Sequence, residues 1–283
     1  MNQSKTSTRL LLVSAVIILI ILAGGPLGYK YFMVPMMPSL MSLVLAFAGG
    51  LLLLVSAVVM LFIALRQRLL KDRNLLLITM VLSSVPVIVM LPQFIALLSV
   101  PPIHDITTDT VNPPVFDAIV PLRAGAPNSL VYGSGLLAAD ILANKENIDY
   151  PQAFKAEIHI MPDTSDILEN ESNPMHAAVL SYMQSAAYPH IRSLDTSLGI
   201  AQAVSRAETV LGEQGLDIVA VNAEKGLVEA TETSFWFGFK NDVVVRVTAL
   251  DNGSRIDVRS VSRMGISDIG KNAARIEQFL QAF

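Results

Sequence analysis

Three long stretches without charge dominate the first hundred residues. Charged side chains stand only at their ends, at Arg9, Lys30 and Arg66. Each stretch supplies the ~20 apolar residues needed to cross ~30 Å of hydrocarbon, and a backbone in lipid must satisfy its hydrogen bonds internally. The pattern therefore predicts three transmembrane helices, at about residues 10–29, 39–65 and 75–99.

The first stretch also has features of a signal peptide. It has a basic start, an apolar core and the small residues Ala23, Gly24 and Gly25. A lipoprotein processing site would need a cysteine where Gly25 stands. Because two further spans follow, we expect a retained helix, although a cleaved signal stays open and would leave the domain on the same side.

Basic residues predict the orientation of this anchor. The segment 66–73 is the most basic in the chain, and Lys5 and Arg9 precede the first span. Cytoplasmic loops carry the excess of Lys and Arg. We therefore expect a multi-pass protein of a bacterial inner (plasma) membrane, with a cytoplasmic N-terminus and a periplasmic C-terminal domain. The lack of ionisable groups at the centres of the spans argues against a transporter or pump.

The pattern changes to that of a water-soluble domain over residues 101–283. Helices are predicted at about 173–187 and 197–213 and from about Asp268 to the end. Between them lie four strand-like runs, with turn signals such as Asn252-Gly253. The runs are near residues 216–222, 227–236, 242–250 and 254–262. We expect an α+β fold in which helices pack on an antiparallel four-stranded sheet.

Composition separates the two parts further. The chain is 52% hydrophobic, and residues 1–100 hold seven of its 20 basic and one of its 24 acidic residues. The remainder is thus strongly acidic, which argues against a nucleic-acid partner. The chain has no cysteine, which excludes disulfides and thiolate chemistry.

Polar residues gather in the last two predicted strands and the turn that follows. Asp257 and Arg259, two apart, share one face of a strand. Several arginines near a helix start could bind a carboxylate or phosphate, helped by the amides of residues 265–269. They could also form a structural network, with Arg246 paired to Asp257 and Arg275 paired to Asp268 or bonded to carbonyl oxygens. The candidate ligand-binding residues are Arg246, Asp257, Arg259, Arg263, Ser267, Asp268, Asn272 and Arg275.

A second candidate lies directly after the anchor. His104, Asp105 and Asp109 could ligate a divalent metal or act as an acid/base pair, although such residues also commonly close turns. No histidine spacing typical of a metal site accompanies them, so no metal or other cofactor is predicted. An aromatic run at residues 234–239 is expected to pack in the core with its turn covered; its alternative role is to touch lipid headgroups or a partner.

Four segments together resemble a known family. They are Pro-Pro-Ile-His-Asp-Ile-Thr-Thr-Asp at 101–109 with Asn-Pro-Pro-Val-Phe at 112–116, Ala-Tyr-Pro at 187–189, Phe-Lys-Asn-Asp-Val-Val-Val-Arg at 239–246, and the stretch 257–276. This resembles the DUF1499 family over residues 101–283 and leaves the anchor outside. The resemblance implies no established activity. Family members often carry Asp-Asp where this chain has Asn241-Asp242, which weakens any role that needs two carboxylates there.

Two functions remain open from the sequence. The first is a membrane-anchored, non-enzymatic module of the cell envelope, binding or structural, with an arginine-rich turn that binds anions. Its partners would be the lipid bilayer and an envelope protein or a small anionic ligand. The alternative is a metal-dependent or acid/base hydrolase-like enzyme that uses His104, Asp105 and Asp109.

Overall fold

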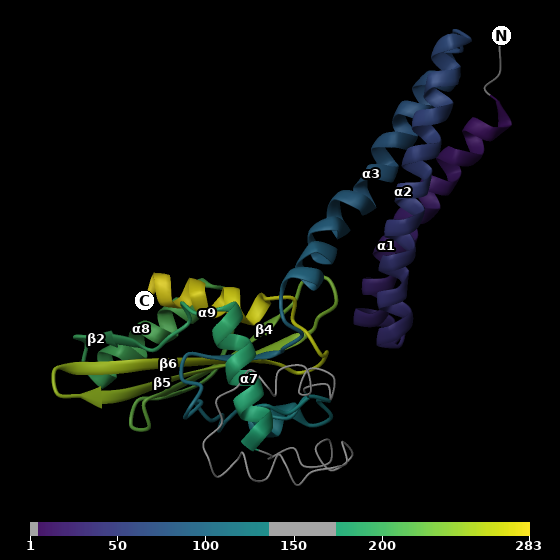
Figure 1. The fold of residues 1–283 in the computed structure, drawn as a ribbon. Coiled ribbons are helices and arrows are strands. Elements are labelled where there is room, and N and C mark those ends of the chain that lie inside the picture. The colour runs from purple at the N-terminus through teal and green to yellow at the C-terminus, as the bar shows by residue number, and fades with distance from the viewer. Residues whose placement is uncertain (1–4, 136–173) are drawn as a thin grey trace, which may run out of the picture. The chain divides into compact units, whose positions relative to one another are not determined.

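The computed structural model describes residues 5–135 and 174–283 (Figure 1). The chain divides into two compact units. One comprises Met1–Leu98 with the short segment Phe235–Gly238, and the other comprises Ser99–Ser234 with Phe239–Phe283. Each unit is described by itself below.

The first unit consists of three helices, each long and apolar enough to cross a membrane. They are α1 (Thr6–Phe32), α2 (Met36–Arg66) and α3 (Leu70–Ser99). The three predicted apolar N-terminal helices are confirmed, and each begins three to five residues before its predicted start.

Small residues set the close spacing between these helices. A Cβ on Gly25 would lie 2.7 Å from the carbonyl oxygen of Ser39, and one on Gly50 would lie 2.5 Å from Cγ of Pro86. Membrane helices associate through such close backbone approaches, because lipid offers no hydrophobic driving force between them. Gly50 therefore has a packing role between α2 and α3.

The second unit combines helices with an antiparallel sheet. Its helices are the short 3-10 helix η1 (Val120–Arg123), α7 (Pro174–Ala187), α8 (Ile200–Glu213) and α9 (Lys271–Ala282). Its strands are β1 (Asp105–Thr107), β2 (Leu194–Thr196), β3 (Asp217–Asn222), β4 (Leu227–Thr233), β5 (Lys240–Leu250) and β6 (Gly253–Ser262). The predicted α+β class is confirmed.

The sheet has six strands, so the prediction of four was wrong. Its order is β1-β6-β5-β4-β3, and β2 also pairs with β6. The outer edge of β6 is thus covered twice, by β1 against Arg259–Val261 and by β2 against Ser254–Ile256. Both added strands have three residues, too few to show an alternating pattern of their own.

One face of the sheet carries the main apolar core. Val243, Val245 and Val247 of β5 pack with Ile256 and Val258 of β6 in a single buried cluster. That cluster includes residues of α7, α8 and α9, and Figure 1 shows α8 and α9 along this side of the sheet. The strong apolar stripes of α8 and α9 predicted this packing.

The opposite face is covered by the chain that follows β1, residues 109–131, which we call the covering segment. Phe116 and Ile119 from this chain pack against Val244 and Val261 in a second, smaller cluster. Figure 1 shows the teal segment with η1 on the side of the sheet away from α8 and α9. The rest of this face is charged, which is the feature that defines the candidate site.

Candidate functional site

The charged face of the sheet follows from strand alternation. Successive side chains along a strand point to opposite faces, so the side chains that alternate with the buried apolar residues of β5 and β6 lie on the face opposite the main core. Five buried charged side chains lie on that face, each at most 3% exposed: Asp105, Glu229, Asp242, Asp257 and Arg259. The Arg246 side chain on the same face is 18% exposed.

Arg259 donates hydrogen bonds from all three nitrogens of its guanidinium group. Its Nε and Nη2 donate to the two carboxylate oxygens of Asp105, at 3.0 and 2.7 Å. It also donates to the carbonyl oxygens of Pro114 (3.2 Å) and Leu130 (2.8 Å). Both charged side chains are about 4% exposed or less. A bidentate pair of this kind fixes orientation as well as charge, so Arg259 ties the covering segment to β6 and β1.

Two aromatic rings flank the same guanidinium. Arg259 Cζ lies 5.7 Å from the ring centroid of Phe116 and 5.6 Å from that of Tyr132, within the range of cation–π attraction. Burial raises the pKa of the Tyr132 hydroxyl, and the charge of Asp105 raises it further. Tyr132 therefore stays neutral and serves as a packing partner of Arg259.

Asp242 is the centre of a second buried group. It is 0% exposed and accepts from Arg263 Nε and Nη2 at 2.9 Å each, from the Thr231 hydroxyl at 2.8 Å and from Arg123 Nη1. Arg263 also donates to the carbonyl oxygen of Leu122 at 2.7 Å. Two arginines thus share one carboxylate as their counter-charge. A buried charge is tolerated only with such pairing.

Glu229 of β4 anchors the covering segment without a cation. Its Oε1 accepts from the backbone N–H groups of Asp117 (2.8 Å) and Ala118 (3.0 Å), and its Oε2 accepts from that of Ile119 (2.8 Å). These three amides open the turn that leads into η1. Negative charge at a helix start is favourable, because the free amides there carry partial positive charge.

The remaining arginines also have carboxylate partners. Arg246 Nη2 donates to Asp257 and to Asp109, at 2.9 Å each. The Arg246–Asp257 pair is thus as predicted. Arg275 Nη2 donates instead to Glu232 at 3.1 Å, so its predicted pairing with Asp268 was wrong. Glu232 comes from β4, a strand that the spacing around Arg275 gives no reason to choose.

Asp268 organises the turn before α9. Its carboxylate accepts from the backbone N–H groups of Gly270 (2.8 Å) and Asn272 (2.7 Å). Burial raises the pKa of this carboxyl, although those two amide bonds lower it in part. Two of the amides expected to help hold an anion already have partners: the N–H of Asp268 donates to the carbonyl oxygen of Ile103, and that of Ile269 donates to Ser267 Oγ.

Asn272 connects this turn to the sheet and to His104. Its Nδ2 donates to the carbonyl oxygen of His104 at 2.8 Å and to Ser262 Oγ at 3.0 Å. Its Oδ1 accepts from Ser260 Oγ at 2.8 Å and from Arg275 Nη1 at 2.7 Å. All of this side chain's hydrogen-bonding capacity is used, and it is 0% exposed. Asn272 is thus a structural hub of the cluster.

The second candidate group does not assemble into one site. Asp105 is bound by Arg259 and Asp109 by Arg246. His104 is 4% exposed, with Nδ1 3.4 Å from the carbonyl oxygen of Ile266, and burial lowers the pKa of its imidazole. Within residues 5–135 and 174–283, no group of three or more His, Cys, Asp or Glu side chains could hold a metal ion.

Two central members of the network, Arg123 and Glu229, were not among the residues predicted from the sequence. Arg123 meets Asp242 across 119 positions of sequence, and Glu229 meets its amides across 110 to 112 positions. A possible signal was an arginine and a glutamate at positions that the alternation buries, because a buried charge requires a partner. Neither position revealed which partner that would be.

Three exposed apolar side chains of this domain lie on segments that meet near the turn. Val120, Leu122 and Ile266 are 51%, 53% and 50% exposed, and their segments are joined by the Arg263–Leu122 bond and by Asn128 Nδ2 to the carbonyl oxygen of Gly265 (2.9 Å). We call Val120, Leu122 and Ile266 the turn patch.

In the aromatic run at 234–239, Phe235 and Trp236 are 85% and 47% exposed, so their predicted place in the core was wrong.

Comparison with known proteins identifies the family and nothing beyond it. A model of the DUF1499 family, described as a protein of unknown function, matches residues 105–283. No curated protein and no solved structure matches the chain. The match begins at the first residue of β1 and covers every element that builds the charged face.

Proposed function

Because the chain belongs to the DUF1499 family, whose function is unknown, we propose its role from the geometry alone: a membrane-anchored, non-enzymatic module of the cell envelope. Three apolar helices hold it in a membrane. We further propose a bacterial inner membrane, with the N-terminus in the cytoplasm and the domain in the periplasm. The basic segment 66–73 supports this orientation, since cytoplasmic loops are rich in Lys and Arg.

The observation that carries the proposal is that the charged residues form intramolecular ion pairs with one another. Arg259, Arg246, Arg263 and Arg275 each donate to a carboxylate. An added anion would have to displace a buried partner, and breaking a buried pair costs about 3–5 kcal/mol. Of the two roles that the sequence left open for these arginines, the geometry therefore favours the structural one over anion binding.

The hydrolase-like alternative gains no support from the same geometry. Asp105 and Asp109 are each held by a different arginine, so their carboxylate oxygens already have hydrogen-bond partners. A general acid or base must reach the proton it transfers, and His104 is buried behind the turn that contains Ile266.

The binding role is proposed for the turn patch. Its three apolar side chains are about half exposed, and the polar side chains of Asn128 and Arg263 join the segments that carry them. Protein interfaces commonly have an apolar centre and a polar rim. We therefore propose that the turn patch contacts another protein of the envelope.

The orientation can be tested directly because the chain has no cysteine. Single cysteines would replace Ser7 in α1, Lys71 in α3 and Asn252 in the β5–β6 turn, all exposed positions. In intact cells, a membrane-impermeant maleimide is expected to label only the Asn252→Cys variant. Labelling of the other two should require permeabilised membranes. Labelling of Lys71→Cys but not Asn252→Cys in intact cells would reverse the orientation.

The contact surface can be tested by photo-crosslinking in intact membranes. A photoreactive residue would replace Ile266 in the turn patch or, as the matched control, Leu250. Leu250 is 38% exposed and pairs with Gly253 at the opposite end of the sheet. A discrete protein adduct from position 266 that position 250 does not give is expected. Equal adducts from both positions, or lipid adducts alone from position 266, would refute the turn patch as a protein contact.

A further inference from the structure

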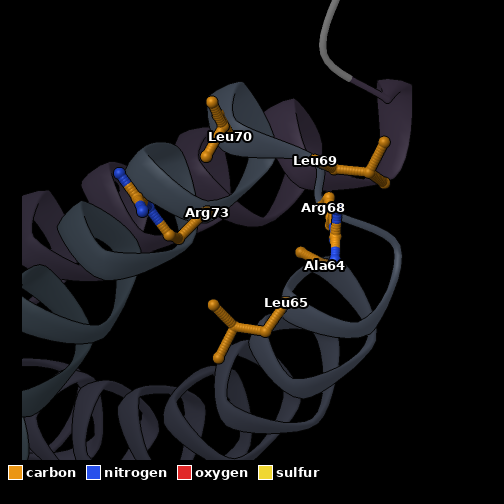
Figure 2. Close-up of a pocket in the computed structure, with 6 residues that line it drawn as sticks. All are labelled: Ala64, Leu65, Arg68, Leu69, Leu70 and Arg73. Atoms are coloured by element: carbon orange, nitrogen blue, oxygen red, sulfur yellow. The ribbon is translucent and has the colours of Figure 1, made fainter.

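A cavity of about 270 Å³ lies where α2 passes into α3. Figure 2 shows Arg68 and Arg73 on either side of it, with Leu65 at its edge. The complete lining is Ala64, Leu65, Arg68, Leu69, Leu70 and Arg73. Four apolar side chains and two cations therefore share one hollow at an end of the membrane-spanning helices.

The cavity follows from how the chain reverses direction. Arg68 adopts the left-handed conformation, with φ of 54°. The N–H of Leu69 then bonds to the carbonyl oxygen of Ala64 at 2.9 Å, which ends α2, while the N–H of Arg73 bonds to the carbonyl oxygen of Leu69 at 2.9 Å, which starts α3. This tight reversal leaves the ends of the two helices apart and sets the two arginines around the space between them.

The charges of these arginines are not neutralised by the nearby carboxylate. Asp72, the acidic residue of the segment 66–73, is buried and accepts from the backbone N–H of Lys5 at 2.9 Å. Among residues 5–135 and 174–283, Arg73 donates only to the neutral amide of Asn74, from Nε and Nη2 at 3.2 and 3.1 Å. Arg68 is exposed. This differs from the outer domain, where the arginines of the candidate site are paired with carboxylates.

We propose that this cavity binds the headgroup of an anionic phospholipid. The phosphate would lie between Arg68 and Arg73, since guanidinium groups bind phosphate oxygens in a bidentate manner. Leu65, Leu69 and Leu70 would contact the glycerol and the first methylene groups. Basic pockets between membrane helices bind the headgroups of anionic lipids. Such binding requires only that the three helices span a membrane.

The test compares two double variants of the full-length protein that remove equal charge. Arg68→Gln with Arg73→Gln changes the cavity, whereas Arg66→Gln with Lys71→Gln changes the same loop outside its lining. Each protein would be purified in detergent and titrated with phosphatidylglycerol or phosphatidylcholine, with bound lipid counted by native mass spectrometry. Inorganic phosphate would be titrated separately.

We expect the wild-type protein and the control variant to retain phosphatidylglycerol in preference to phosphatidylcholine. The cavity variant should bind phosphatidylglycerol at least about tenfold more weakly, because two direct phosphate contacts are lost. An equal loss in both variants would show only diffuse attraction by the basic loop and would overturn the site. No preference in the wild-type protein, or equally strong binding of inorganic phosphate, would overturn the lipid assignment.

Discussion

The substitution Glu229→Gln tests whether one buried carboxylate holds the covering segment on the sheet. Glutamine has nearly the same shape but one acceptor oxygen fewer. The least costly arrangement turns its –NH₂ toward Ile119, the amide on the side with a single contact. That N–H is then buried without a partner, at a cost of about 1–3 kcal/mol, and the bonds to Asp117 and Ala118 lose their charge assistance.

We expect a total loss of about 2–4 kcal/mol in the free energy of unfolding of the outer domain. For a domain of 150–250 residues this lowers Tm by roughly 5–15 °C. The measurements are thermal unfolding of the full-length protein by circular dichroism and hydrogen exchange of its backbone amides. The exchange of amides 117–119 should accelerate more than that of the β5–β6 ladder, because the damage begins at the covering segment.

Glu224→Gln is the matched control, because Glu224 is exposed in the turn between β3 and β4. It should change the free energy of unfolding by less than about 0.5 kcal/mol. The reasoning fails if the two variants unfold at the same temperature, or if amides 117–119 keep their protection in Glu229→Gln. Either result would mean that the apolar contacts of Phe116 and Ile119 suffice to hold the segment.

Two further predictions concern buried ionisable groups. Asp242→Asn should destabilise the protein by about 3–5 kcal/mol, because Arg123 and Arg263 lose their shared counter-charge. Asp195→Asn, which breaks an exposed ion pair, should cost less than about 1 kcal/mol. Thermal unfolding of both variants distinguishes a structural pair from a dispensable one. Burial lowers the pKa of His104 below 6.5 in the folded protein, so the folded state favours the neutral imidazole. The stability that this provides is fully present above about pH 6.5 and is lost as the pH falls toward the pKa of the folded state. Urea midpoints at about pH 7.5 and 5.5 should therefore fall more for the wild-type protein than for His104→Gln, and equal falls would contradict the argument.

The fold was predictable where the chain itself sets the structure. Alternation in β5 and the Asn252-Gly253 turn predict the β5–β6 hairpin, and its register is regular along its whole length. The strands β1 and β2 could not be predicted in the same way, because three residues become a strand only by pairing with β6. The last helix starts at Lys271 rather than near Asp268, because Ile269 and Gly270 take left-handed conformations (φ 51° and 80°).

The candidate site was predictable only along neighbouring strands. Arg246 and Asp257 face each other directly in the β5–β6 register, so their spacing was enough to pair them. The partner of Arg275 was not, because Glu232 lies 43 positions away on β4. Ion pairs of long sequence separation depend on the path of the whole chain, which local patterns do not encode.

The pairing of β1 with β6 also delays folding of the domain during translation. Asp105 follows the third helix closely, but its partner Arg259 is made 154 residues later. At a synthesis rate of about 5–20 residues per second, that interval lasts roughly 8–30 s. During this interval β1 and the covering segment lack their partner strand β6, and the carboxylate of Asp105 stays in water. The domain therefore closes only when its C-terminal hairpin emerges, so a chain that stops before β6 leaves both ends of the network unfinished.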